Sequence, residues 1–217
     1  MVLGKIMKHI RIKICGITRV EDALAAANAG VDAIGLVFYD KSPRCVNIGE
    51  AKKIVSILPA FVSVVALFVN ETAEKINHIL SEVPIDIIQF HGDETTEFCS
   101  QFNRPYIKAI RVKTDNCIPN AIYEYKNARA LLFDTFHQNQ YGGVGESFDW
   151  SLIPPNIEKS WILAGGLNLD NIKNAIISTK ATCVDISSGV ESQKGIKSPE
   201  KIITIVKAIR LIENGVD

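Results

Sequence analysis

Runs of β-forming residues alternate with helical patterns along nearly the whole 217-residue chain. The strand-like runs cover residues 9–16, 32–38, 61–70, 85–92, 106–112, 128–136, 161–166 and 182–189. The helical patterns cover residues 18–30, 49–59, 71–83, 93–102, 121–127, 168–178 and 198–214. Such alternation indicates parallel strands with helices packed outside them. Eight units of about 27 residues each favour a single-domain TIM (β/α)8 barrel over residues 1–217, at the compact end for that fold. An open, doubly wound α/β sheet is the alternative, because alternation alone does not reveal closure.

The first helical pattern carries both a start and a stop signal. Thr18 is followed three residues later by Glu21, as in a capping box. Gly30 is suited to the left-handed conformation that often ends a helix. We therefore predict a helix that Thr18 caps and Gly30 terminates.

Charge and cysteine content exclude several classes of protein. Lys plus Arg and Asp plus Glu each total 24, so no basic excess points to a nucleic-acid or membrane-surface partner. No apolar run reaches the ~18–20 residues that span a bilayer, and the N-terminal sequence does not resemble a signal peptide. The five cysteines form no CxxC pair, and His, Cys and carboxylates show no metal-ligand spacing. We predict a cytoplasmic protein without a structural metal.

Polar residues and glycines gather where the predicted strands end, which is where barrels place their active sites. These positions are Cys15, Arg44, Gln89, His91, Arg111, Asp134, Gly165, Gly166, Asp185, Ser187, Ser188 and Gly189. Because side chains alternate along a strand, an inward Cys15 implies an inward Lys13, and an inward Asp134 implies inward Leu132 and Ala130. A buried carboxylate is costly unless it is partnered or functional, so Asp134 is the strongest catalytic candidate. Its structural alternative is a helix cap or a salt bridge, and that of Cys15 is an inert buried thiol.

The segments at 163–168 and 185–192 follow the last two strands, where barrels often bind phosphate. Glycines allow backbone N–H groups to approach an anion, and serine hydroxyls add hydrogen bonds. We predict phosphate binding there, with two tight βα turns as the alternative. On the remaining strand ends, Arg44 can bind a substrate carboxylate, and Arg111, Gln89, His91 and Asp185 can line the pocket. A solvated Arg44 and a rim histidine at His91 are the structural alternatives.

Several motifs, in this order, resemble the phosphoribosylanthranilate isomerase family. They are KICGIT at 13–18, KSPR at 41–44, QFHGDE at 89–94, LLFDT at 131–135, GGVGESFDW at 142–150, LAGGLN at 163–168 and VDISSGVES at 184–192. The resemblance implies a barrel and a cofactor-free Amadori rearrangement in tryptophan biosynthesis. The substrate would be N-(5-phosphoribosyl)anthranilate and the product 1-(2-carboxyphenylamino)-1-deoxyribulose 5-phosphate.

The same resemblance assigns roles to individual residues. It implies that Cys15 is the general base, Asp134 the general acid, and Arg44 the ligand of the anthranilate carboxylate. The glycine and serine loops at 165–166 and 187–189 would bind the phosphate. Val144 and Glu146 depart from the family pattern in the glycine run after Asp134, which is a candidate lid over the substrate.

Three other functions are compatible with parts of the sequence. An aminoimidazole isomerase of histidine synthesis would perform the same rearrangement, but it would be expected to use two aspartates. A catalytically silent barrel that binds a phosphorylated metabolite would not need Cys15 and Asp134. A cysteine-dependent redox or acyl-transfer enzyme lacks a partner cysteine at CxxC spacing. Monomer and homodimer both remain open.

Overall fold

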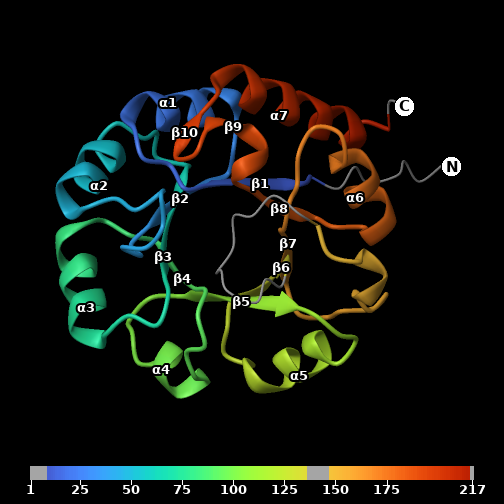
Figure 1. Ribbon diagram of the computed structural model, residues 1–217, viewed down its shortest axis with the longest axis horizontal. Coiled ribbons are helices and arrows are strands. Elements are labelled where there is room, and N and C mark those ends of the chain that lie inside the picture. Colours follow the sequence, from blue (N-terminus) through green and yellow to red (C-terminus); the bar gives the residue numbers. More distant parts are fainter. Residues whose placement is uncertain (1–8, 136–146, 216–217) are drawn as a thin grey trace, which may run out of the picture.

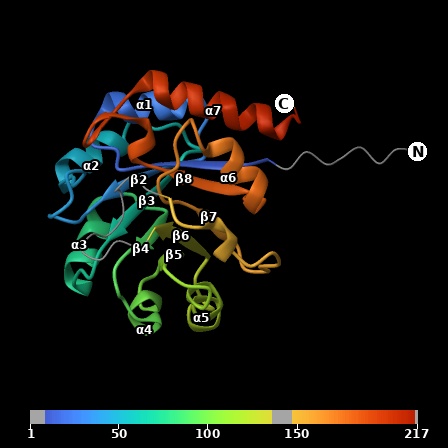
Figure 2. The ribbon, with the colours of Figure 1, turned by 45° about the vertical axis from the view of Figure 1, so that its right-hand side comes forward.

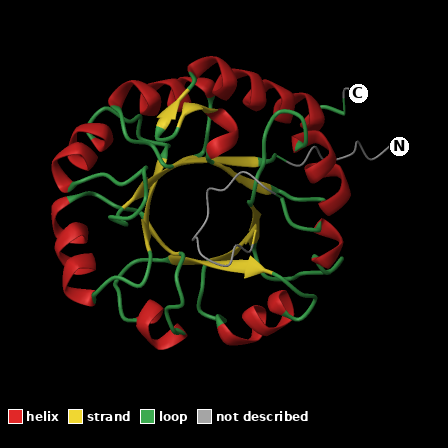
Figure 3. Cartoon of the chain, viewed as in Figure 1, coloured by secondary structure: helices red, strands yellow, loops and turns green. Residues whose placement is uncertain are grey.

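The computed structural model describes residues 9–135 and 147–215, in which eight parallel strands form a closed barrel inside a ring of helices (Figures 1 and 3). The strands are β1 (Arg11–Cys15), β2 (Ala33–Val37), β3 (Ser63–Phe68), β4 (Ile87–Phe90), β5 (Tyr106–Val112), β6 (Ala130–Thr135), β7 (Trp161–Leu163) and β8 (Cys183–Ile186). Pairing of β1 with both β2 and β8 closes the sheet. The predicted (β/α)8 barrel is confirmed, and the open sheet is wrong.

Seven α-helices lie in the described ranges and cover the outside of the barrel. They are α1 (Val20–Ala29), α2 (Ile48–Val55), α3 (Ala73–Glu82), α4 (Thr96–Ser100), α5 (Cys117–Glu124), α6 (Ile172–Thr179) and α7 (Pro199–Glu213). Between β6 and β7, the described residues contain a 3-10 turn, η1 (Trp150–Leu152), in place of an α-helix. The first and last helices, α1 and α7, lie side by side, which closes the helical ring (Figures 1 and 2). No helix in these ranges is long and apolar enough to cross a bilayer.

The strands divide their side chains between two apolar layers. Outward-facing residues such as Leu131 and Phe133 belong to the large core between sheet and helices. A smaller cluster fills the barrel interior and consists of Ile107, Ala109, Ala130, Leu132, Ile162 and Ala164. Ala130 and Leu132 therefore point inward, and by alternation so does Asp134. The predicted orientation of the aspartate strand is confirmed.

The predicted helix cap at Thr18 is wrong. Arg19 is the N-cap residue of α1 and makes no side-chain capping bond, whereas the Thr18 hydroxyl donates to the carbonyl of Gly195, 2.5 Å away. A tertiary contact has replaced the local one. The predicted stop at Gly30 is confirmed, with φ 87°. A capping box does occur at α2, where Asn47 and Glu50 exchange hydrogen bonds.

A small hairpin that the sequence pattern does not predict lies between β8 and α7. A 3-10 turn, η2 (Ser188–Val190), leads into β9 (Glu191–Gln193), which pairs antiparallel with β10 (Ile196–Lys197). Strands this short carry no periodic signal. In Figure 1 the hairpin lies between the barrel strands and the helices α1 and α7.

Candidate active site

A cavity of about 570 Å³ opens at the carboxyl ends of the strands. Ten of the predicted site residues line it: Cys15, Arg44, Gln89, His91, Asp134, Gly165, Gly166, Asp185, Ser187 and Ser188. They come from β1, β4, β6 and β8 and from the loops after β2, β4, β7 and β8. The closed sheet thus brings together residues that are up to 173 positions apart in the chain. Arg111 and Gly189 are not among the lining residues.

Cys15 lies at the end of β1, buried at the base of the cavity. Gly35 on β2 faces its thiol, and a Cβ atom added at Gly35 would lie 2.8 Å from the sulfur. A glycine inside a strand often marks such a close approach. Lys13 lies on the same face of β1, and its ammonium donates to Asp185 Oδ2 over 2.9 Å.

Two opposing effects act on the Cys15 thiol. Burial raises the pKa of Cys15 above its ordinary value, and the nearby Lys13 ammonium opposes that rise. Burial alone would lower the pKa of Lys13, but Asp185 and Cys15 raise it overall, so the lysine is a permanent cation. The predicted influence of Lys13 on the thiolate therefore has a structural basis, although burial is the larger effect.

This balance leads to a prediction for Lys13→Met. Removal of the ammonium should raise the pKa of Cys15 further, because Lys13 lowers it and the remaining Asp185 raises it. The rate of Cys15 alkylation by iodoacetamide, followed against pH by peptide mass spectrometry, should reach its half-maximum at higher pH than in the unmodified protein. Lys13→Arg keeps the charge and serves as the control. An unchanged alkylation profile in Lys13→Met would show that the lysine does not act on the thiol.

Asp134 is the last member of a row of three hydrogen-bonded side chains, which also contains Gln89 and His91. Its Oδ1 accepts from the Thr135 amide at 2.8 Å, and its Oδ2 lies 3.0 Å from His91 Nε2. The other ring nitrogen of His91 lies 3.1 Å from Gln89 Nε2. The side chains of Gln89, His91 and Asp134 are all buried, and both ring nitrogens of His91 have a partner, so the alternative of a satisfied rim histidine stays open beside a role in the pocket.

The Gln89–His91–Asp134 chain can serve both protonation states of Asp134. With the Gln89 amide nitrogen toward the ring, Nε2–H of His91 donates to an ionised carboxylate. With the amide reversed, Nδ1–H donates to Gln89, and Nε2 accepts a proton shared with the protonated carboxyl. The geometry therefore suits a carboxyl group that gives up and regains a proton.

The loops after β7 and β8 meet backbone to backbone. Gly165 and Gly166 have φ of 83° and 61°, a conformation that favours glycine. Because of this turn, β7 ends at Leu163, three residues before the predicted end. A side chain at Gly165 would collide with Thr135, and one at Gly189 would collide with the Leu167 carbonyl. Gly189 thus permits the contact between the two loops, while Ser187 and Ser188 line the cavity.

Arg44 is buried, so its structural alternative as a solvated arginine is wrong. Its Nε and Nη2 donate to Glu191 over 2.7 and 2.8 Å. The side chain crosses Gly16, where φ is 76° and a Cβ atom would collide with it. A guanidinium has a second edge, formed by Nη1 and Nη2, which can still bind a carboxylate with two hydrogen bonds.

Arg111 occupies an inward position on β5, but its guanidinium pairs with Asp93 in the loop after β4. A substrate contact by Arg111 remains a prediction.

Several functional positions escaped the sequence analysis. Lys41 and Lys194 contribute cationic side chains to the cavity, and Tyr39, Leu67 and Val69 contribute apolar ones. Lys194 gave no signal, because isolated lysines are usually solvated, and Lys41 stands out only as part of the KSPR motif at 41–44. Within the described ranges, no group of three His, Cys, Asp or Glu side chains is arranged to hold a metal ion.

Enzymes with a (β/α)8 barrel work at this end of the strands, and the chain belongs to that class of enzyme. The family model for N-(5'phosphoribosyl)anthranilate (PRA) isomerase matches residues 12–208. Similar proteins named N-(5'-phosphoribosyl)anthranilate isomerase occur in Neisseria gonorrhoeae (58% identity, 92% of this chain, 96% of the relative) and Pseudomonas syringae pv. tomato (52%, 94% and 98%).

Solved structures give the same result. The phosphoribosyl anthranilate isomerase of Thermotoga maritima superposes with a TM-score of 0.85 at 38% identity, covering 93% of this chain and 98% of that one. Another isomerase structure, in complex with reduced 1-(o-carboxyphenylamino)-1-deoxyribulose 5-phosphate, has a TM-score of 0.82 at 38% identity with the same coverage. The chain is a member of the phosphoribosylanthranilate isomerase family.

Proposed function

We propose that Cys15 and Asp134 act as general base and general acid in the isomerisation of N-(5'-phosphoribosyl)anthranilate, the reaction of this family in tryptophan biosynthesis. The observation that carries the proposal is the presence of both side chains in one cavity, with the β7 and β8 loops at its rim. The product is 1-(2-carboxyphenylamino)-1-deoxyribulose 5-phosphate.

The reaction needs one proton donor and one proton acceptor. The Asp134 carboxyl protonates the ribose ring oxygen as the C1–O bond breaks, which leaves a Schiff base cation at C1. That cation acidifies the C2–H bond, and the Cys15 thiolate removes the C2 proton to give an enolamine. Protonation at C1 and loss of the hydroxyl proton at C2 then yield the ketone. No electrons leave the substrate, so the expected mechanism requires no cofactor.

Two buried oxygen atoms suit the binding of sugar hydroxyls. Among the residues described, Gln89 Oε1 and Asp185 Oδ1 have no hydrogen-bond partner, although both belong to side chains that line the cavity. A buried acceptor without a partner is destabilising, and a substrate hydroxyl would satisfy it. We assign the anthranilate carboxylate to the outer edge of Arg44 and the phosphate to Gly165, Gly166, Ser187 and Ser188, and we retain Gly189 as support for these loops.

The small-molecule substrate is the partner that the site supports. The cytoplasmic location stays a prediction, as does the choice between monomer and homodimer; a related isomerase from Thermotoga maritima is described as dimeric. Val144 and Glu146, in the candidate lid, lie outside the described residues.

A fluorescence assay tests the function directly. Anthranilate-type fluorescence should fall when the purified protein meets freshly prepared N-(5'-phosphoribosyl)anthranilate, with a chelator present and no cofactor added. The aminoaldose of histidine synthesis serves as the comparison substrate. Folded protein that leaves the fluorescence unchanged would overturn the proposed function.

A further inference from the structure

Lys197 is a fully buried cation that the proposed mechanism does not use. Its side chain is 0% exposed and lies on β10, in the hairpin between β8 and α7. The ammonium group contacts Glu191 Oε1 at 2.9 Å, the Ser187 carbonyl at 3.1 Å and the Ser187 hydroxyl at 3.5 Å. Three acceptors match the three N–H bonds of an ammonium group. Burying a charge is costly, so this arrangement calls for an explanation.

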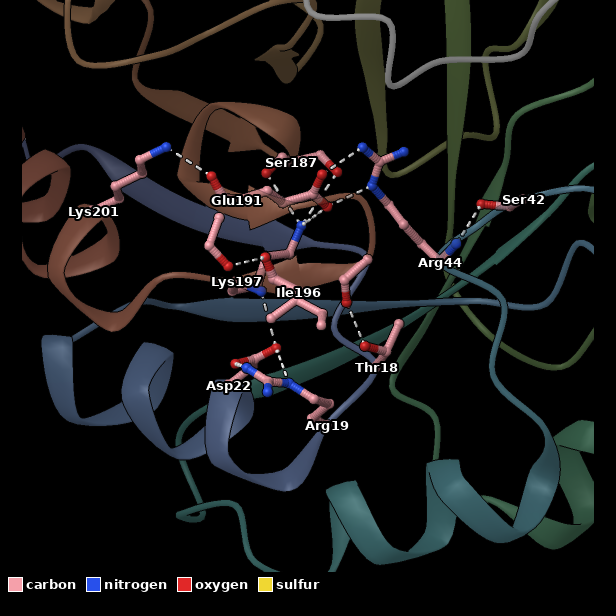
Figure 4. Close-up of polar contacts among 12 residues, drawn as sticks. Thr18, Arg19, Asp22, Ser42, Arg44, Ser187, Glu191, Ile196, Lys197 and Lys201 are labelled. Atoms are coloured by element: carbon pink, nitrogen blue, oxygen red, sulfur yellow. Dashed lines mark hydrogen bonds and ion pairs between the residues drawn. The ribbon is translucent and has the colours of Figure 1, made fainter.

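The first of these contacts leads to Arg44. Glu191 accepts from Lys197 and from Arg44 with the same carboxylate, so the two cations hold it from two sides (Figure 4). Burial would raise the pKa of Glu191, but Arg44 and Lys197 outweigh burial and lower it. The carboxylate is therefore ionised and fixes the guanidinium in one orientation. Arg44 also lines the cavity, and its second edge makes no bond to Glu191.

The other two contacts of Lys197 lead to the loop after β8. Ser187 begins the loop after β8, and its carbonyl and hydroxyl both face Lys197. Ser188 follows it and also lines the cavity. Lys197 thus holds the backbone of the loop to which we assign the phosphate.

Lys197 is itself fixed from the side of α1. Its backbone amide donates to Asp22 Oδ2 over 3.0 Å, and Arg19 pairs with the same aspartate. The Thr18 hydroxyl donates to the Gly195 carbonyl at the tip of the hairpin. Figure 4 shows these contacts converging on the hairpin from α1 and from the β2 loop. The ammonium group therefore projects from a well-anchored element.

We propose that Lys197 is a positioning residue for the reaction, which holds Arg44 through Glu191 and the phosphate loop through Ser187, so that both anionic ends of the substrate are bound in a fixed relation. This inference rests on the proposed function, which assigns the substrate carboxylate to Arg44 and the phosphate to the β8 loop. Lys197 does not line the cavity, and its charge lowers the pKa of Cys15 less than that of Lys13 does, so the inference concerns binding rather than proton transfer.

Steady-state kinetics of Lys197→Met test the proposal. Loss of a charge-assisted hydrogen-bond network should raise KM by about 10- to 100-fold. The kcat should stay within about threefold, because interactions made equally in ground and transition states affect KM alone. Inorganic phosphate and anthranilate, used separately as competitive inhibitors, should both bind more weakly. A change for only one of them would overturn the coupling of the two ends.

Two further variants separate positioning from general stability. Lys201 on α7 donates to the backbone carbonyl of Glu191 over 2.7 Å, not to its carboxylate, so Lys201→Met should lower the melting temperature but leave KM unchanged. Lys197→Arg keeps the charge and should recover most of the lost affinity. An equal KM increase in Lys201→Met, or a normal KM in folded Lys197→Met, would contradict the proposal.

If Lys197→Met fails to fold, Glu191→Gln provides the same test from the other side. The amide keeps one acceptor oxygen but places an NH2 group where Glu191 Oε2 accepts from Arg44 Nη2, and it removes the negative charge between the two cations, so KM should again rise while kcat is retained. A normal KM in that variant would overturn the role of the network. Absence of turnover in the unmodified protein would instead refute the proposed function, and the two failures are therefore distinguishable.

Discussion

Cys15→Ser should fold normally and lose about 10²- to 10⁴-fold in kcat, the contribution expected of a general base. Serine is close in size to cysteine, and the space between β1 and Gly35 accommodates it. Its hydroxyl, however, is far too weak an acid to be ionised at neutral pH, so the C2 proton of the substrate has no acceptor. The measurement is kcat and KM from the fluorescence assay, with thermal unfolding to establish that the barrel is intact.

A second cysteine provides the control for this substitution. Cys117 begins α5 on the outer surface and does not line the cavity, so Cys117→Ser should retain full activity. Full turnover by Cys15→Ser would remove the base assignment. Loss of turnover in both variants would point to a general effect of losing a thiol.

Asp134→Asn should bind a product analogue with nearly unchanged affinity but lose about 10²- to 10⁴-fold in kcat, as expected for a general acid. The amide has the shape of the carboxyl group, and its oxygen can still accept from the Thr135 amide. His91 Nε2 can accept a hydrogen bond from the new amide nitrogen, while its other ring nitrogen stays bonded to Gln89. The amide cannot protonate the ring oxygen, so ring opening is slowed. The measurements are kcat and the dissociation constant of reduced 1-(o-carboxyphenylamino)-1-deoxyribulose 5-phosphate.

Asp86→Asn is the matched control for the acid. Asp86 lies before β4, at the opposite end of the barrel, and its carboxylate accepts from the Val64 amide as that of Asp134 does from Thr135. The control variant should lose some stability but no activity. Near-normal turnover by Asp134→Asn would remove the acid role, whereas lost affinity for the analogue would indicate a binding role instead.

Much of the site was predictable because it follows from strand order. Parallel strands end at one rim of the barrel, so Cys15 and Asp134 were expected to face the same space, as they do. Alternation predicted that Leu132 and Asp134 share a face, and the interior cluster confirms it. The glycines after β7 were correctly placed in the cavity wall, although β7 itself is shorter than predicted.

The sequence by itself determined the period of the strands, the order of the barrel and the positions of its chemical groups along the rim. These features depend on local spacing, which the chain carries in its residues. Only the tertiary structure decided which side chains contact each other. Arg44 meets Glu191 across 147 positions, and Thr18 meets Gly195 instead of capping α1. Lys197 is a buried cation only because the hairpin folds back onto the β8 loop. The physical reason is that a charged side chain takes the partner that the closed barrel brings near, and no local pattern records which loops will meet.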